Sequence, residues 1–180
     1  MKAVVFLADG FEECEGLIVV DILRRAGVET IMASVMESLE VDSSRHIKIT
    51  ADVSAENLDL RGIDLIVLPG GRLGTENLKK SDIIRTACIS FAEKKLIAAI
   101  CAAPSILDEL GLLNGKKVTC HPDFEKNIKN AIITGDSVTV DGNIITGRGL
   151  GASFLFAFEL VRVLCGDDKV DLIKEAICFN

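Results

Sequence analysis

The sequence predicts an α/β fold: a mainly parallel, doubly wound sheet with helices on both faces. Segments with apolar residues at helical spacing alternate with short apolar runs, and this alternation indicates a parallel sheet between two helical layers. The runs are continuous rather than alternating, which is typical of strands buried on both faces. They are AVVFLA at 3–8, DLIVLPGG at 64–71 and LIAAI at 96–100.

The other elements follow in chain order. Leu17, Val20 and Leu23 share one face of a helix that we predict over 13–26, and Gly27 ends it. No linker or internal repeat interrupts the chain, so we expect a single domain over 1–180. The remaining expected elements are a strand at 28–34, a hairpin around 46–49, helices at 82–94 and 103–110, a strand at 117–120, a hairpin at 138–146, and helices at 152–164 and 169–178.

Composition and charge limit the class of partner. The chain has 180 residues, 49% hydrophobic, with a formal net charge of -7 and no block of basic residues. We therefore expect no nucleic acid and no anionic membrane as a partner. The first apolar run ends at Asp9 without a cleavage site, and no later run is long enough to span a bilayer, so we expect a cytoplasmic protein.

The cysteine pattern argues against metals and disulfides. Six cysteines are spread without a CxxC pair, and the chain has only two histidines, so we expect no metal site. A reducing compartment disfavours disulfides. Cys88, Cys165 and Cys178 stand in apolar surroundings, and we expect them to be core thiols.

Ligands of such sheets bind beyond the carboxyl ends of the strands. The first of these loops reads ADGFEE and lacks the glycine pattern of a dinucleotide site; its carboxylates would also repel a pyrophosphate. We therefore expect no cofactor. The other loops to inspect begin at Pro69, Cys101 and His121.

Cys101 stands where the strand at 96–100 meets the next helix. Small residues at Ala99 and Ala103 suit a strained strand-to-helix elbow, and Pro104 suits a first helical turn. A helix N-terminus would lower the pKa of the thiol and favour a nucleophilic thiolate. The alternative is that Cys101 is a buried structural cysteine.

Two neighbouring loops supply candidates for the same site. Gly70 and Gly71 end a strand and allow close approach of a ligand, and the amides of Gly71 and Ala102 could form an oxyanion hole. His121 follows a strand and could act as a general base, although a lone loop histidine is more often a solvated bystander.

Glu15 lies in the first turn of the first helix. Acidic residues there stabilise the helix dipole without any further function, and this explains Glu12 and Glu13. Glu15 is one turn in, beside the apolar face, and we expect it to turn inward with a raised pKa. It could then share a proton with the cysteine, whereas an ionised Glu15 would oppose thiolate formation.

Several motifs in one order resemble the ThiJ/PfpI superfamily, specifically the subgroup with a human deglycase associated with parkinsonism. They run from Lys2 to about Gly166: ADGFEECE, VDILRRAG, VLPGGxLGxxNL, AAICAAP, HP and ITGRGLGASF. The resemblance implies a flavodoxin-like fold of the class I glutamine amidotransferase-like type. It also implies a homodimer with the helix at 13–26 in the interface.

The resemblance also assigns residues and an activity. Cys101 matches the family's reactive, easily oxidised cysteine, Glu15 its hydrogen-bonded acid, and His121 the nearby histidine. Arg45 matches an arginine near the pocket, and Arg25 one that reaches across the dimer. Gly71 and Ala102 match the amide pair; because Ala102 is not the histidine of the protease-like branch, a peptidase is not implied.

Two functions remain open. One is a cysteine-dependent, cofactor-free glyoxalase or deglycase that converts methylglyoxal, or its adducts on proteins, to a hydroxy acid. The other is an oxidative-stress sensor or chaperone in which Cys101 is oxidised without turnover. Both depend on the same cysteine.

Overall fold

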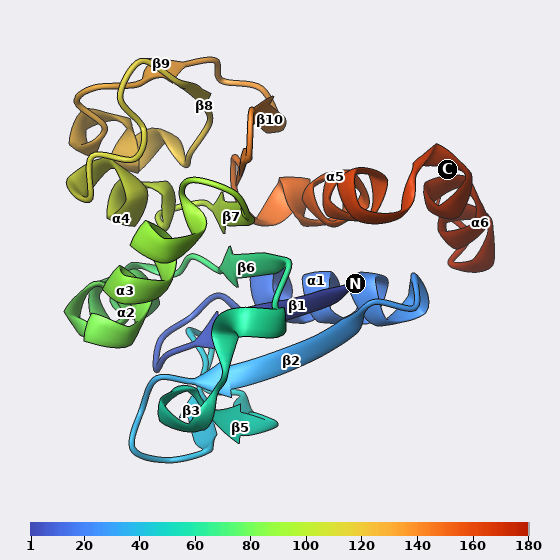
Figure 1. The fold of residues 1–180 in the computed structure, drawn as a ribbon, viewed down its shortest axis with the longest axis horizontal. Coiled ribbons are helices and arrows are strands. Elements are labelled where there is room, and N and C mark those ends of the chain that lie inside the picture. Colours follow the sequence, from blue (N-terminus) through green and yellow to red (C-terminus); the bar gives the residue numbers. More distant parts are fainter. Residues whose placement is uncertain (180) are drawn as a thin grey trace.

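A seven-stranded sheet forms the centre of the computed structural model, which describes residues 1–179 (Figure 1). The strand order is β10-β11-β7-β6-β1-β2-β5, and every neighbouring pair is parallel except β10 with β11. The predicted doubly wound, mainly parallel sheet is confirmed. Its strands are β1 Lys2–Leu7, β2 Glu29–Ser34, β5 Val53–Ser54, β6 Leu65–Leu68, β7 Leu96–Ile100, β10 Val138–Asp141 and β11 Ile144–Gly147.

Helices cover both faces of this sheet. The predicted helices at the start and end of the chain are confirmed, and the helix at 72–80 was not predicted. The helices are α1 Glu13–Arg25, α2 Arg72–Lys80, α3 Asp82–Phe91, α4 Pro104–Glu109, α5 Ser153–Cys165 and α6 Asp167–Ala176. Two small sheets flank the main one: the predicted hairpin of β3 (Glu40–Asp42) with β4 (Lys48–Thr50), and the parallel pair of β8 (Lys117–Val118) with β9 (Ile132–Ile133).

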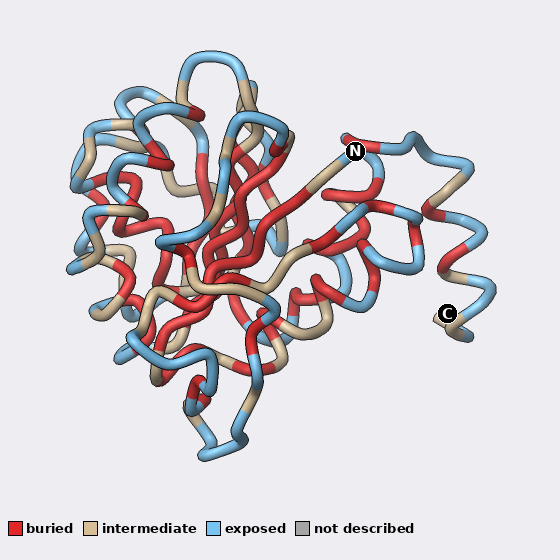
Figure 2. Tube along the Cα trace, turned by 60° about the horizontal axis from the view of Figure 1, so that its bottom comes forward, coloured by how far each residue is buried: buried red, intermediate tan, exposed pale blue. Residues whose placement is uncertain are grey.

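Successive side chains of each strand point to opposite faces of the sheet, and this divides the core into two layers. In β1, Val5 and Leu7 pack with residues of α1 and α5, while Val4 and Phe6 pack on the opposite face with residues of α3 and α4. All four are fully buried, and the strands form the buried centre of the trace in Figure 2. The sheet is therefore a rigid platform whose carboxyl edge can hold side chains in fixed positions.

The last part of the chain extends away from this platform. Helix α6 packs against α5 and lies at the far right of Figure 1. Within residues 1–179, no helix combines the length and the apolar content needed to cross a membrane.

The prediction that three cysteines are buried in the core is wrong for two of them. Cys88 is buried on α3, as expected, but Cys165 and Cys178 are exposed. The reason is that both stand at helix ends: Cys165 is the last residue of α5, and Cys178 follows α6, which ends at Ala176.

Candidate active site

Cys101 follows β7 directly and adopts a left-handed backbone conformation, with φ at 64°. A residue with a side chain pays about 1–3 kcal/mol for such a conformation, so the surrounding bonds must hold it. The Cys101 N–H donates to the Gly147 carbonyl at 2.9 Å, and the Cys101 carbonyl accepts from the His121 N–H at 2.9 Å. The predicted strained elbow is confirmed, and it ties the end of β7 to the end of β11 and to the His121 loop.

Glu15 turns inward from the first turn of α1, as predicted. It is 1% exposed, and its Oε2 accepts the Gly70 N–H at 2.9 Å. A Cβ at Gly70 would lie 2.5 Å from that oxygen and 2.6 Å from the Cβ of Cys101. Only glycine therefore allows Glu15 and Cys101 to approach each other across this strand end.

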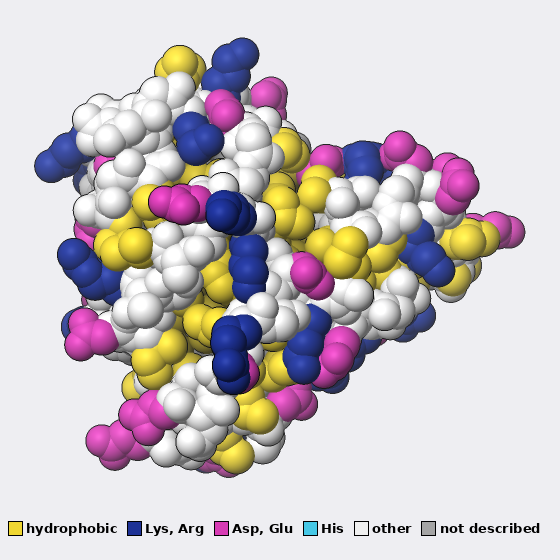
Figure 3. Space-filling model, in the orientation of Figure 1, with side chains coloured by type: hydrophobic (Ala, Val, Ile, Leu, Met, Phe, Trp, Pro, Cys, Tyr) yellow, Lys and Arg dark blue, Asp and Glu magenta, His cyan; other side chains and the backbone are white. Residues whose placement is uncertain are grey.

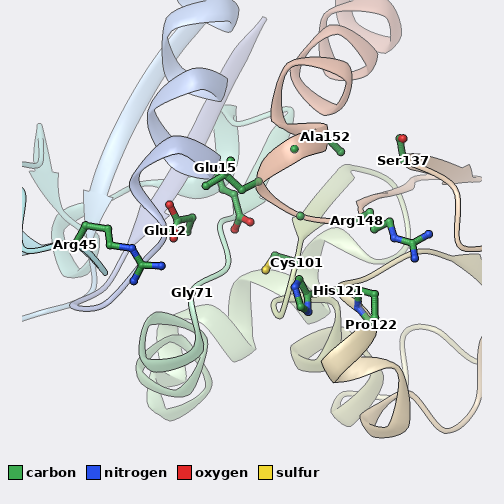
Figure 4. A pocket seen from close by; sticks show the side chains of 13 residues that line it. Glu12, Glu15, Arg45, Gly71, Cys101, His121, Pro122, Ser137, Arg148 and Ala152 are labelled. Atoms are coloured by element: carbon green, nitrogen blue, oxygen red, sulfur yellow. The ribbon is translucent and has the colours of Figure 1, made fainter.

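These groups line a cavity of about 510 Å³, whose side chains are shown in Figure 4. Cys101 lies at its centre, between Glu15 on one side and His121 on the other. The remaining lining residues come from the ends of neighbouring elements. They are Glu12, Arg45, Gly71, Pro122, Ser137, Arg148, Gly149, Leu150, Gly151 and Ala152.

Burial raises the pKa of Glu15 from 4.5 to about 7. The hydrogen bonds from Cys101 and Gly70 oppose this rise, and the charge of Glu12 adds to it. Close to neutral pH the carboxyl therefore exchanges its proton readily, as a group that transfers protons in catalysis must.

We expected the pKa of the Cys101 thiol to be lowered, but its surroundings raise it. Burial, followed by the charge of Glu15 and a hydrogen bond to it, raises the pKa of Cys101 to about 12, although the amides of Gly71 and Ala102 oppose the rise. Helix α4 is only six residues long, which limits its dipole. Glu15 and Cys101 thus behave as a coupled pair: a thiolate is favourable only when Glu15 holds the proton.

His121 lies beside the cysteine and is the N-cap of a short 3₁₀ helix, Pro122–Asn127. Its Nδ1 accepts the Asp123 N–H at 3.2 Å. A neutral imidazole that accepts at Nδ1 carries its proton on Nε2. In this tautomer the Nε2–H of His121 can donate a hydrogen bond, and its role as a general base stays a prediction.

Of the remaining predicted site residues, some lie at the cavity in the positions expected and others do not. The amides of Gly71 and Ala102 face the sulfur, whereas the Gly70 amide is occupied by Glu15 and does not serve as an oxyanion donor. Arg45 lines the cavity, as expected. Arg25 does not line the cavity of its own chain: it ends α1, roughly 18 Å from the helix start, and its Nε donates to Asp21 at 2.7 Å.

From the resemblance, Leu150 was expected in the pocket wall that follows β11, and it lines the cavity, but Arg148 and Gly149 beside it were not singled out. A Cβ at Gly149 would lie 4.0 Å from the Cys101 Sγ and 3.5 Å from the Cδ2 of His121, so the bare backbone of Gly149 faces both. Arg148 donates through Nη1 to the Gly135 carbonyl and joins this wall to the loop of Ser137. The sequence signal that could have found them is the expected hairpin at 138–146. Its second strand, β11, is parallel to β7 and therefore ends at the same edge of the sheet as Cys101.

No metal centre accompanies these groups in the described part of the chain: residues 1–179 contain no set of three or more His, Cys, Asp or Glu side chains that could hold an ion.

Comparisons with known proteins agree with this architecture. "Parkinson disease protein 7 homolog" from Danio rerio is 38% identical over 182 residues, which cover 96% of this chain and 94% of the relative. The structure described as "Toxoplasma gondii DJ-1, oxidized" superimposes with a TM-score of 0.95 at 32% identity, covering 99% of this chain and 98% of that one. The flavodoxin-like α/β fold is thereby confirmed.

Other relatives carry names that state an activity. A "Glutathione-independent glyoxalase" from Caenorhabditis elegans is 28% identical over 174 residues, covering 93% of this chain and 90% of the relative. A protein named as a deglycase from Pyrococcus abyssi is 28% identical over 166 residues, covering 91% of this chain and 99% of the relative. The DJ-1/PfpI family profile matches residues 1–163. The resemblance noted from the motifs is confirmed: this chain belongs to the DJ-1/PfpI family.

Proposed function

We propose that this protein is a cysteine-dependent, cofactor-free glyoxalase or deglycase that converts methylglyoxal, glyoxal or their adducts to hydroxy acids. The observation that carries the proposal is the pairing of Cys101 with a buried, proton-exchanging Glu15 in a cavity of small-molecule size. The glyoxalase and deglycase names of relatives support the same chemistry.

The first step forms a bond between the Cys101 sulfur and the aldehyde carbon of methylglyoxal. The thiol proton passes to Glu15 as the sulfur attacks, and from there to the aldehyde oxygen, which gives a hemithioacetal. The amides of Gly71 and Ala102 stabilise the negative charge that develops on that oxygen. The Nε2–H of His121 donates to the neighbouring ketone oxygen.

The second step moves two protons without any oxidant. Glu15 removes the proton from the hemithioacetal carbon and returns it to the neighbouring carbon, and the hydroxyl proton of the hemithioacetal passes to the former ketone oxygen, so that the aldehyde carbon is oxidised while the ketone carbon is reduced. The product is a lactoyl thioester on Cys101. Water then adds to the thioester, the thiol leaves, and lactate is released; the net reaction consumes methylglyoxal and one water.

The test is loss of methylglyoxal with appearance of lactate, using purified protein. Cys101→Ser should lower the rate by at least about 100-fold, because it removes the nucleophile. Cys165→Ser is the matched control: this thiol is exposed and lies at the far end of α5, so its replacement should leave the rate unchanged. A Cys101→Ser variant with the wild-type rate would overturn the proposal.

A second function uses the same sulfur without turnover, as an oxidative-stress sensor or chaperone. It is favoured by one observation, namely that a similar structure is described as oxidized. The amides of Gly71 and Ala102 and a protonated Glu15 could donate to the oxygens of a sulfinate. If peroxide oxidises Cys101 readily while no lactate forms, this second function is the better description.

A further inference from the structure

Two hydrogen-bond donors flank Cys101, and they come from distant parts of the chain. Gly71 precedes α2, and its amide faces the sulfur, while His121 precedes the 3₁₀ helix at Pro122–Asn127. Both line the catalytic cavity, and they lie to either side of Cys101 in Figure 4. Their separation must be held fixed if the two donors are to reach the two oxygens of one small substrate.

The side chains that follow these two donors contact each other. Arg72 is the first residue of α2, and its Cζ lies over the ring of Phe124, 5.2 Å from the ring centroid. Phe124 in turn lies edge-on to the imidazole of His121, with ring centroids 6.4 Å apart and an interplanar angle of 79°. A continuous path therefore runs from Gly71 through Arg72 and Phe124 to His121.

The Arg72 guanidinium is free to interact with the ring. Among residues 1–179 its side chain donates no hydrogen bond and forms no ion pair, unlike Arg24, Arg61 and Arg162. Its positive charge is therefore not neutralised by a carboxylate, and the ring quadrupole attracts it. Phe124 packs against the core below it, so its ring is a fixed surface for the cation.

Other contacts hold the loop that begins at His121 only at its ends. The His121 N–H donates to the Cys101 carbonyl at 2.9 Å, and Ile128 is buried after the 3₁₀ helix. Within the described residues, the imidazole makes one hydrogen bond, from the Asp123 N–H to Nδ1 at 3.2 Å. That bond is local to the loop, so it does not fix the imidazole relative to Gly71. The contact of Phe124 with Arg72 does.

We propose that Arg72 and Phe124 are positioning residues, which hold the His121 loop against the start of α2 and so set the distance between the Nε2–H of His121 and the amide of Gly71. This inference rests on the proposed function, in which these donors contact the two oxygens of methylglyoxal. Neither positioning residue touches the substrate. Loss of their contact should lower kcat rather than raise KM, because both donors act mainly on charge that develops in the transition state.

The kinetic test measures lactate formation by variants of the contact. Arg72→Ala and Phe124→Leu should each lower kcat about three- to fivefold and change KM less than about twofold, as expected for an exposed cation–π contact. The double variant should be no slower than Phe124→Leu alone, because that change already removes the contact. Arg72→Lys keeps a cation over the ring and should restore most of the rate, whereas the neutral Arg72→Gln should not.

The chain contains a matched control for these variants. Lys95 Nζ lies over the ring of Phe91 at 4.7 Å, which is a cation–π contact of the same kind. Lys95 precedes β7, whereas Cys101 follows it, so this second contact lies at the opposite end of the strand from the site. Lys95→Ala should therefore leave kcat and KM unchanged.

Proton NMR of the imidazole groups gives a readout that does not depend on turnover. The chain has two histidines, and His46 is 89% exposed in the β3–β4 hairpin, so it serves as an internal reference. At fixed pH, Arg72→Ala should shift the ring-proton resonances of His121, through Phe124, and leave those of His46 in place. Arg72→Lys should return them toward their wild-type positions.

The two measurements separate failure of this inference from failure of the proposed function. An unchanged kcat in Arg72→Ala, an equal loss in Arg72→Lys, or unmoved His121 resonances would overturn the positioning role. Lactate formation with unmoved resonances would keep the glyoxalase activity and overturn the role of the contact. Shifted resonances in a protein that forms no lactate would keep the contact and overturn the activity.

Discussion

Replacing Glu15 by glutamine should change how stability depends on pH. Glu15 is 1% exposed, and its pKa is raised from 4.5 to about 7 by burial. The folded state therefore holds this proton more tightly than the unfolded state does. Stability is highest below the unfolded value, falls as the pH rises between 4.5 and about 7, and stays reduced above that range.

The size of the effect follows from the shift. A rise of roughly 2.5 pKa units corresponds to about 3 kcal/mol of destabilisation at alkaline pH, at about 1.4 kcal/mol per unit. Glutamine cannot ionise, yet its Oε1 can still accept the Gly70 N–H. Relative to the wild type, Glu15→Gln should therefore gain about 2 kcal/mol between about pH 5.5 and about pH 8.

Urea unfolding at both pH values measures this difference, and comparing the two values cancels any effect of the substitution that does not depend on pH. Glu13→Gln is an informative control, because Glu13 is nearly as buried. Burial raises its pKa, but hydrogen bonds from backbone groups and from Ser43 and Ser44 outweigh this, so its pKa is lowered. Glu13→Gln should thus lose stability relative to the wild type as the pH rises. Parallel pH curves for Glu15→Gln and the wild type would refute the assigned proton uptake.

Four further outcomes are expected. Lactate formation should rise as the pH increases through about 7, because the pair that contains Glu15 must lose one proton before it can act; a rate independent of pH there would contradict this role. Gly71→Ala should destabilise the protein by several kcal/mol in urea unfolding, since its φ is 85° and a Cβ would lie 2.3 Å from the Gly10 carbonyl oxygen, whereas Gly27→Ala, at φ 81° with open space around it, should cost only about 1 kcal/mol. Graded peroxide followed by peptide mass spectrometry should oxidise Cys101 first among the six cysteines, because Glu15 accepts the thiol proton as the sulfur attacks although the pKa of the resting thiol is raised, and should leave the buried Cys88 reduced; equal reactivity would count against both functions. Light scattering should give a dimer at micromolar concentration, because α5 carries exposed apolar side chains next to α1, and apolar groups gather over α5 and α6 in Figure 3; a monomer mass would contradict it.

The sequence predicted the sheet well because its strands are short and apolar on both faces. The strand at 96–100 was placed at its observed limits, and the helix at 13–26 differs from α1 by one residue. Helix α2 was missed because Gly71 and Gly74 resemble turn residues. In the structure Gly74 is helical, and a Cβ there would lie 2.5 Å from the Cα of Phe11, so this glycine serves close packing rather than a turn.

The site was predictable only where position along the chain determines geometry. Cys101 and His121 come directly after predicted strands, and Glu15 lies beside the apolar face of its predicted helix. All three could therefore be found from the sequence. Gly149 was missed because the hairpin at 138–146 was not recognised as contributing a strand to the parallel sheet. Once β11 pairs with β7, its carboxyl end must open onto the same edge as Cys101.

The thiol pKa shows why the chemistry itself could not be inferred from local pattern. The elbow and the helix start at Pro104 both favour a thiolate, but they act on a sulfur whose other neighbour is a buried carboxyl from α1. The Glu15 carboxyl, together with burial, determines the direction of the thiol pKa shift, because two negative charges in hydrogen-bonding contact at a buried site are unfavourable. One proton must therefore stay on the pair at neutral pH: it rests on the sulfur while Glu15 is ionised, and on Glu15 when the sulfur attacks. A nucleophile built in this way does not need a low thiol pKa, since the same carboxyl that suppresses the thiolate at rest accepts its proton at the moment of reaction.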